Sequence, residues 1–356
     1  MQDNYIYCIG LMSGTSLDGI DLAYIKIHKK LYKDFKILKA DTISYSNEWK
    51  SKLQEAINYD EKDLEVLDIE YGKLLGKVLS NFITEHRILK LDFIASHGHT
   101  ILHQPEAGIT LQIGNGQEIA NITKKEVICD FRTQDVELGG QGAPLVPIGD
   151  KLLFVDYDYC LNLGGFANIS YEKNKERIAF DICPVNIVLN HYTRKLGLDF
   201  DDKGIVASKG EINIKLLENL NSLPFYTQLP PKSLGLEWVQ STIFPLINEE
   251  ETEIPTILRT FVEHSAIQIG KVIEDKNEAT VLVTGGGAFN SFLINRIEFY
   301  IKKTVPMVDD GLINYKEALV FAFLGLLKKQ EKVNCLQSVT GAKKDHSSGK
   351  FFYPQK

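Results

Sequence analysis

Three glycine-rich turns follow apolar, β-branched runs, and they carry the residues that could bind phosphate. The first turn lies in IGLMSGTSLDGID, from Ile9 to Asp21, the second in LNLGGFANIS from Leu161, and the third in VTGGGAFN from Val283. Small residues at the end of a buried strand expose backbone N–H groups, which suit phosphate oxygens. One such turn alone indicates little, because ordinary hairpin turns use the same residue types. Three of them, two at corresponding places in the two halves of the chain, favour a phosphate site.

The common nucleotide-binding strings do not occur in the sequence. It has no G-x-x-x-x-G-K-[ST] string, no G-x-G-x-x-G string after a strand, and no H-R-D or D-F-G set of a protein kinase. A bound nucleotide therefore requires a fold of another kind. Two β-hairpins that hold phosphates from two domains, with a third glycine-rich turn beside the adenosine, form the plan of the sugar kinase, actin and Hsp70 superfamily. This chain resembles that plan.

Strand-like and helix-like segments alternate around the three turns. Short β-branched runs typical of buried strands flank each turn. The clearest helical spacing of apolar residues runs from Lys62 to Ile83, and residues 255–274 and 315–330 are predicted to form two more helices. This alternation predicts an α/β protein in two halves. The resemblance further implies a two-domain, actin-like ATPase fold with a central cleft.

The boundary between the halves is predicted near residues 150–158, although no Gly/Ser/Pro-rich linker marks it. We expect residues 1–152 to form an N-terminal domain with the first phosphate hairpin, completed by residues 335–356. Residues 153–334 are expected to form a C-terminal domain that carries the other two glycine-rich turns.

Composition and charge exclude several classes of protein. The 356 residues carry a net charge of −7 without a long basic stretch, so no nucleic-acid surface is expected. No apolar run approaches the roughly 20 residues of a membrane span, and the first residues lack a signal-peptide pattern. The five cysteines are widely spaced and include no C-x-x-C pair, which fits a reducing compartment. We therefore expect a cytoplasmic protein that binds neither nucleic acid nor membrane.

A series of longer strings narrows the resemblance to one family. In chain order they are GLMSGTSLDGID, SHGHTILHQP, TLQIGNGQEIA, DFRTQDVELGGQGAPLVP, LNLGGFANIS, LPPKSLG, VTGGGAFN, EALVFAFLG and SVTGA. They run from about Ile9 to Ala342 and resemble anhydro-N-acetylmuramic acid kinase. The strings MSGTS-x-DG-x-D and GGQGAPLVP are the most specific to that family.

The resemblance implies an activity and its small-molecule partners. Enzymes of this family use ATP to open the 1,6-anhydro ring of a muramic acid from cell-wall turnover and to phosphorylate O6, which gives N-acetylmuramic acid 6-phosphate. ATP, Mg²⁺ and the sugar are thus the expected partners, and a homodimer is expected because members are often dimers. The matching strings imply ATP or phosphate binding by Gly14, Thr15, Ser16, Leu17, Asp18, Gly19, Ile20, Asp21, Gly164, Gly165, Asn168, Gly285, Gly286, Gly287 and Asn290.

Carboxylates take two roles under this resemblance. Asp18 or Asp21 is expected to hold Mg²⁺ through water, because this ion prefers oxygen ligands and retains several waters. Asp181 in RIAFDICPVN matches the family's catalytic aspartate. It would take a proton from the water that attacks the anomeric carbon, and the freed O6 would then attack the γ-phosphoryl group. The alternative for Asp181 is a helix N-cap, since Pro184 follows three residues on.

The sequence departs from the family pattern beside this aspartate. The family usually reads DTGPGN, whereas this chain has Ile182, Cys183 and Val185 in place of a hydroxyl and two glycines. We expect Cys183 and Val185 to add bulk near the base, and Val185 to resist a positive φ. The departures favour a branch of the family with compensating changes, but a different substrate or a weak enzyme stays open.

Sugar-binding residues are implied on both sides of the predicted boundary. A flexible loop that links the domains is the alternative for the glycine-rich segment after Arg132. An acid in the first turn of a helix, which favours the helix dipole, is the alternative for Glu317. A zinc site at the histidines of SHGHTILH is not expected, because no fourth ligand lies at a suitable spacing. The sugar-binding residues implied by the resemblance are His97, Arg132, Gln141, Asn186 and Glu317.

Two other functions remain as alternatives to the anhydro-sugar kinase. A related kinase for a different sugar would phosphorylate an ordinary hydroxyl group without opening a ring. A nucleotide-binding regulator would keep its affinity for ATP through the three glycine-rich turns but would turn over no sugar.

Overall fold

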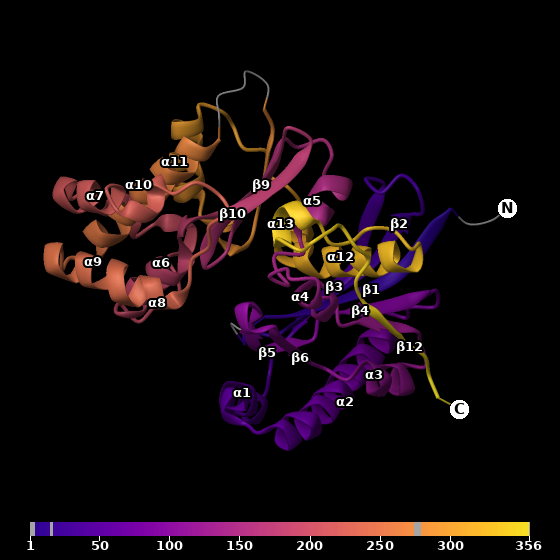
Figure 1. The fold of residues 1–356 in the computed structure, drawn as a ribbon. Helices are drawn as coiled ribbons and strands as arrows, with labels where there is room; N and C mark the ends of the chain where they lie inside the picture. The colour runs from indigo at the N-terminus through magenta and orange to yellow at the C-terminus, as the bar shows by residue number, and fades with distance from the viewer. Residues whose placement is uncertain (1–3, 15–16, 274–278, 356) are drawn as a thin grey trace. The chain divides into compact units, whose positions relative to one another are not determined.

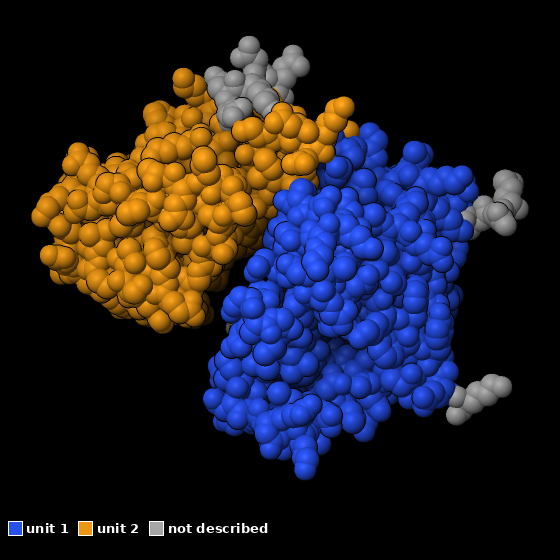
Figure 2. Space-filling model, viewed as in Figure 1, with its two compact units in different colours: residues 1–155, 315–356 blue, residues 156–314 orange. Residues whose placement is uncertain are grey.

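The computed structural model describes residues 4–14, 17–273 and 279–355 and has an α/β architecture (Figure 1). Contacts divide the chain into two compact units (Figure 2). Unit 1 comprises Met1–Val155 and Tyr315–Lys356, and unit 2 comprises Asp156–Asn314.

Unit 1 is built on a six-stranded sheet. Its strands are β1 (Tyr5–Ser13), β2 (Ile20–His28), β3 (Phe35–Ile43), β4 (Phe93–Ser96), β7 (Val127–Cys129) and β12 (Lys350–Phe352). The first three strands pair antiparallel in chain order, and β4 joins the other side of β1 as a parallel neighbour. β7 and β12 complete the order β12-β7-β4-β1-β2-β3. A separate hairpin consists of β5 (His99–Gln104) and β6 (Ile109–Ile113).

Helices cover both faces of this sheet (Figure 1). On one face, α2 (Glu61–Glu85) begins after Asp60, whose side chain caps the helix by accepting the Asp63 N–H. Its apolar stripe is buried against β1 and β4, so the helix predicted for residues 62–83 is confirmed. The other helices of unit 1 are α1 (Asn47–Glu55), α3 (Gly116–Thr123), α4 (Thr133–Glu137), α5 (Pro147–Leu153), α13 (Gln337–Thr340) and most of α12 (Asp310–Lys329).

Helix α12 packs on the face of the sheet opposite α2. A Cβ added at Gly10 on β1 would lie 1.8 Å from the Ala318 carbonyl oxygen, and one added at Gly325 would lie 2.7 Å from Phe93. Only glycine permits this close approach of helix and sheet. The predicted boundary at residue 335 assigned this helix to the C-terminal domain, but its packing joins residues 315–329 to unit 1. The division falls at Tyr315, whose dihedral angles (φ −118°, ψ 17°) depart from helical values.

Unit 2 repeats the strand plan of unit 1. Its sheet contains β8 (Tyr159–Leu163), β9 (Phe166–Lys173), β10 (Glu176–Pro184) and β11 (Val281–Thr284) in the order β10-β9-β8-β11. Three antiparallel strands are again followed by one that is parallel to the first. This duplicated plan is that of the actin-like ATPase fold, as the resemblance predicted.

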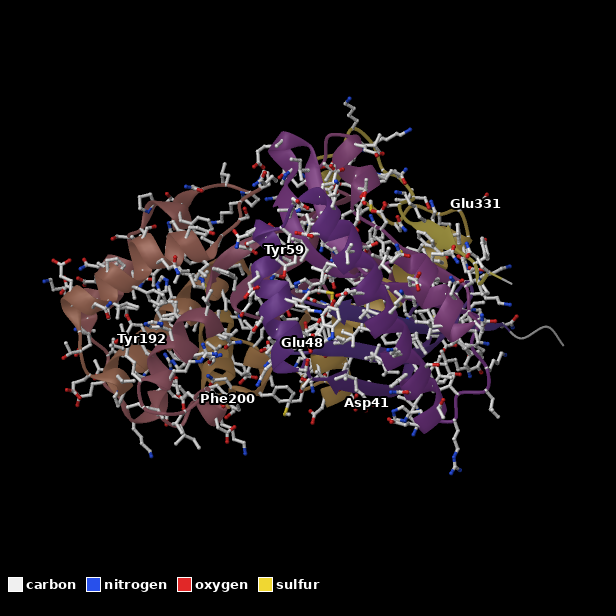
Figure 3. All side chains as sticks on the ribbon, turned by 90° about the horizontal axis from the view of Figure 1, so that it is seen from below. Asp41, Glu48, Tyr59, Tyr192, Phe200 and Glu331 are labelled. Atoms are coloured by element: carbon white, nitrogen blue, oxygen red, sulfur yellow. The ribbon has the colours of Figure 1, made fainter. Side chains whose placement is uncertain are left out.

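The helices of unit 2 pack with its sheet around a separate apolar core. Tyr192 on α6, labelled in Figure 3, is buried in this core, and its hydroxyl donates a hydrogen bond to Asn248 Oδ1 (3.0 Å). None of the helices described in either unit is long and apolar enough to span a bilayer. The helices of unit 2 are α6 (Asn186–Arg194), α7 (Ile214–Asn221), α8 (Leu236–Trp238), α9 (Phe244–Glu250), α10 (Ile254–Val272) and α11 (Ser291–Ile301).

Candidate active site

The first glycine-rich turn joins β1 to β2 in unit 1. Within it, the Leu17 N–H donates to the Gly14 carbonyl oxygen (3.3 Å), and Leu17 adopts a positive φ of 60°. The side chains of Leu17 and Ile20 are buried in the core, so at these two positions only the backbone is available to a ligand. Gly19 packs against β3, where a Cβ would lie 2.7 Å from Thr42 Cγ2. The predicted phosphate ligands Thr15 and Ser16 lie outside the described residues.

The two carboxylates of this turn have different surroundings. Asp18 is exposed, whereas Asp21 is partly buried and accepts a hydrogen bond from the Thr42 hydroxyl (2.6 Å). Burial raises the pKa of Asp21, the Thr42 hydroxyl opposes this shift, and the negative charge of Asp18 adds to it. Two neighbouring carboxylates are a favourable setting for a divalent cation, which relieves their repulsion. The pair therefore fits the expected Mg²⁺ role.

A buried chain of hydroxyl groups holds the end of β1. Tyr45 Oη lies 2.6 Å from Tyr71 Oη, Tyr71 donates to Ser13 Oγ (2.9 Å), and Ser13 donates to the Gly98 carbonyl oxygen (2.7 Å). This chain connects the first glycine-rich turn to the segment that carries His97. The sequence gives no signal for this chain of hydroxyl groups, because its tyrosines lie on separate elements that only the fold brings together.

His97 orients Arg132. The His97 Nδ1 atom lies 2.9 Å from the Gly98 carbonyl oxygen, which only accepts, so Nδ1 carries the proton. The Nε2 lone pair then accepts the Arg132 Nε–H (3.0 Å). Burial and the neighbouring Arg132 charge lower the pKa of His97 well below its ordinary value, which agrees with a neutral ring. His97 is thus a positioning residue for Arg132 here, and its direct contact with a sugar stays a prediction.

The loop after Arg132 is held by Asp135 and by the C-terminal segment. An Arg132 Nη atom donates to the Gly142 carbonyl oxygen (2.5 Å), and the Gly142 N–H donates to Asp135 Oδ2 (2.7 Å). The Gln141 N–H donates to the Thr340 carbonyl oxygen (2.7 Å), while its side chain is exposed. Because these bonds fix the loop within unit 1, a flexible linker between domains is not its role.

Glu317 faces solvent near the Arg132 charge. Helix α12 is interrupted at Tyr315, so Glu317 lies in the first turn of the segment that follows this kink, and the helix-dipole explanation stays open beside sugar binding. The surrounding protein desolvates the carboxylate and raises its pKa, the charges of Lys316 and Arg132 oppose the shift, and Asp21 adds to it. Its side chain nevertheless stays exposed to solvent and therefore accessible. Unit 1 thus brings Asp21 and Arg132 within electrostatic range of Glu317.

The second glycine-rich turn, in unit 2, is bonded to the segment that follows Asp181. The Val185 N–H donates to the Gly165 carbonyl oxygen (2.8 Å), and the Asn186 N–H donates to the Gly164 carbonyl oxygen (3.3 Å). The Asn186 side chain also donates to the Leu163 carbonyl oxygen (3.1 Å), so its amide nitrogen already has a partner. Asn168, which is exposed on β9, lies directly opposite Asp181 on β10. The predicted base and the predicted phosphate turn are therefore neighbours.

Asp181 has the features of a base held in place by the backbone. Its Oδ2 accepts the Leu234 N–H (2.8 Å), and no described residue donates a hydrogen bond to its Oδ1. Burial raises the pKa of Asp181, and the Leu234 N–H opposes the shift. The N-cap alternative is wrong, because α6 begins at Asn186 and its N-cap residue is Val185.

The residues that depart from the family pattern point into the core of unit 2. Ile182, Cys183 and Val185 are all buried there, and the strand register shifts between Asp181 and Cys183. Val185 has φ −136°, so the expected conflict with a positive φ does not arise. The bulk expected beside the base stays a prediction, since burial raises the pKa of the Cys183 thiol and the Asp181 charge adds to this shift. At Cys183 and Val185, where the family has glycine, the side chains fill the interior.

Restoring glycine at Val185 is therefore expected to weaken the fold rather than improve the site. The Val185→Gly variant should lose about 2 to 4 kcal/mol of unfolding free energy, because it removes a buried side chain and adds backbone freedom. Urea unfolding followed by circular dichroism measures the change. Val155→Gly is the control, since Val155 is exposed; equal stability losses in both variants would contradict the packing role of Val185.

The third glycine-rich turn follows β11 and leads into α11. Gly285 has φ 81°, and Cβ atoms added at Gly285 or Gly287 would come within 2.6 to 2.7 Å of Asn162 or Leu163. Packing against the end of β8 therefore requires these two glycines. The Asn290 side chain caps α11 by accepting the Leu293 N–H (3.0 Å), while Gly286 stays exposed. Of the four predicted adenosine-side residues, Gly286 is the most open to a ligand.

Comparison with known proteins gives a match along nearly the whole chain. The family model for anhydro-N-acetylmuramic acid kinase matches residues 6–354. A relative from Bacillus cereus (strain AH187), named anhydro-N-acetylmuramic acid kinase, is 32% identical over 98% of this chain and 100% of its own length. One of the same name from Francisella tularensis subsp. novicida (strain U112) is 33% identical over 96% of this chain and 97% of its own.

Solved structures show a more distant likeness. The activator of the 2-hydroxyisocaproyl-CoA dehydratase from Clostridium difficile, with bound ADPNP, has a TM-score of 0.45 at 13% identity, covering 91% of this chain and 97% of its own. The family assignment depends instead on the sequence match over residues 6–354 and on relatives at 32–33% identity. The chain belongs to the anhydro-N-acetylmuramic acid kinase family.

Proposed function

We propose that this chain uses ATP to open the ring of 1,6-anhydro-N-acetylmuramic acid and to phosphorylate O6, giving N-acetylmuramic acid 6-phosphate for peptidoglycan recycling. The observation that carries the proposal is the position of Asp181. It lies on β10, three residues before the end of the strand, with a raised pKa and the second glycine-rich turn beside it, and none of the described residues donates a hydrogen bond to its Oδ1. A base next to a phosphate-binding turn is what coupled hydrolysis and phosphoryl transfer require.

Asp181 Oδ1 removes a proton from water while the water oxygen bonds to C1 of the sugar. The C1–O6 bond breaks, and the electron pair goes to O6. The freed O6 then bonds to the γ-phosphorus of ATP, and ADP leaves. The Leu234 N–H holds Oδ2 meanwhile, so the carboxylate presents Oδ1 in one orientation.

In unit 1, Arg132 and Glu317 are proposed to bind the sugar, with Arg132 directed at its lactyl carboxylate. Gln141 is proposed to bind the sugar through its exposed side-chain amide, and His97 is proposed to act by orienting Arg132. Backbone N–H groups of the glycine-rich turns are proposed to bind the phosphates. Asp18 and Asp21 would hold Mg²⁺, which supplies charge neutralisation at the phosphates when bound.

The cytoplasm is the proposed location, supported by five widely spaced cysteines that include no C-x-x-C pair. We also propose that the chain forms a homodimer. Light scattering of the purified chain measures its molar mass in solution and tests this.

One assay distinguishes the proposal from its alternatives. With Mg-ATP and 1,6-anhydro-N-acetylmuramic acid in heavy-oxygen water, we expect a 6-phosphate that carries the label at C1. Mass spectrometry locates the label, and N-acetylmuramic acid with a free 6-hydroxyl serves as the comparison substrate. Phosphorylation of the open sugar alone would indicate a kinase without ring opening. ATP binding without any phosphorylated product would indicate a regulator, and either result contradicts the proposal.

A further inference from the structure

Three buried side chains with metal-binding atoms meet in unit 1, away from the carboxylates of the first turn. We call Asp135, Cys335 and His346 the C-terminal cluster. One oxygen, one sulfur and one nitrogen atom from these residues lie within 4.8 Å of one another. Asp135 belongs to α4, and Cys335 pairs with His346 in an antiparallel bridge with backbone hydrogen bonds of 3.1 and 3.2 Å. The backbone therefore fixes the relative positions of the Cys and His ligands.

The His346 ring has a nitrogen lone pair that lacks a hydrogen-bond partner. Its Nδ1 lies 3.1 Å from the Lys344 carbonyl oxygen, which only accepts, so Nδ1 carries the proton. In the neutral ring, Nε2 is then a bare acceptor, and among the described residues it has no hydrogen-bond partner. His346 is only 5% exposed, so bulk water does not satisfy this atom. A buried acceptor without a donor is unfavourable.

The spacing within the cluster fits a shared cation better than a hydrogen bond. Nε2 lies 3.5 Å from Asp135 Oδ1, beyond the roughly 2.7–3.2 Å of an N–H···O bond. Zinc–nitrogen and zinc–oxygen bonds of about 2.1 Å at a tetrahedral angle separate the two ligand atoms by about 3.4 Å. A thiolate and a carboxylate around a divalent cation also leave no net charge in this buried place.

The surroundings of the cluster orient its ligands. Asp135 Oδ1 accepts the Thr340 hydroxyl (2.7 Å) and Oδ2 accepts the Gly142 N–H (2.7 Å), while the Lys344 carbonyl oxygen accepts the His346 Nδ1–H. Hydrogen bonds of this kind orient the ligands in metal sites. Through Gly142, the cluster also connects to the loop that holds Arg132.

We propose that Asp135, Cys335 and His346 bind one zinc ion, with a solvent molecule as the fourth ligand, and that this ion fixes the C-terminal segment to the Arg132 loop. Mixed sulfur, nitrogen and oxygen ligands favour zinc over Mg²⁺, which takes oxygen ligands. The role is structural and does not depend on the proposed reaction.

The test measures metal binding by the full chain without a histidine tag. After dialysis against zinc and gel filtration, elemental analysis should find about one zinc per chain. Co²⁺ in place of zinc should give the near-ultraviolet charge-transfer absorption of a cobalt–thiolate bond. The Cys335→Ser variant should lose that absorption and bind zinc at least tenfold more weakly.

Cys8→Ser is the matched control, because Cys8 is another buried free cysteine of unit 1 outside the cluster. It should retain both the zinc and the absorption. If Cys335→Ser does not fold, the cobalt spectrum of the unaltered chain still decides the question. A chain that binds no zinc and shows no cobalt–thiolate band overturns the proposal.

Discussion

The Asp181→Asn variant is expected to lose about 100- to 10,000-fold in kcat while it binds ATP as tightly as the unaltered chain. Asparagine retains an oxygen that can accept the Leu234 N–H, so the local backbone should persist. It has no carboxylate to accept the proton of the attacking water. Steady-state assays measure kcat, and calorimetry with a non-hydrolysable ATP analogue measures binding. Asp199→Asn, at an exposed site in the same unit, is the control.

The same assignment predicts a direction for the pH profile. Burial raises the pKa of Asp181, so the proton leaves this base only at a pH above the ordinary range for an aspartate. The base is active when deprotonated, so kcat/KM should rise with pH through this raised pKa and then level off. Normal turnover in Asp181→Asn, or a profile without this acidic limb, would locate the base elsewhere.

Features that depend on local periodicity could be predicted from the sequence. The apolar spacing over Lys62 to Ile83 corresponds to α2 almost residue for residue, because a helix that packs on a sheet needs one apolar stripe. The three glycine-rich turns could be predicted because small residues after an apolar, β-branched run indicate a turn at the end of a strand. These glycines do not all indicate a ligand site, however. Gly19 and Gly287 are required by packing against Thr42 and Leu163, whether or not a ligand is present.

Features that depend on which elements meet could not be predicted. The pattern of α12 shows that it is a buried helix but not which sheet it covers, and this decides the boundary between the units. The bond from Thr340 to Asp135 joins residues 205 positions apart. The burial of Cys183 and Val185 in the core of unit 2 likewise depends on which elements meet, and the register shift after Asp181 has no signal in the sequence.

Arg132 should affect the sugar and not the nucleotide. Its guanidinium donates to His97 Nε2 and to the Gly142 carbonyl oxygen from two different nitrogens, and a lysine ammonium cannot reproduce this planar geometry. The Arg132→Lys variant should therefore raise KM for the anhydro sugar at least tenfold, about 1.4 kcal/mol, although the charge is conserved. KM for ATP should change less than twofold.

The comparison with His97→Phe shows whether orientation is the cause. This variant leaves Arg132 its charge and removes the acceptor that holds Nε–H, together with the Nδ1–H bond to Gly98, so its KM for the sugar should rise in the same direction with kcat less affected. Arg194→Lys, at an exposed position in unit 2, should leave both constants unchanged. A lysine variant with unaltered KM for the sugar would mean that only the positive charge matters. The hydrogen-bonded geometry of His97, Arg132 and Gly142 would then serve the fold of unit 1 alone.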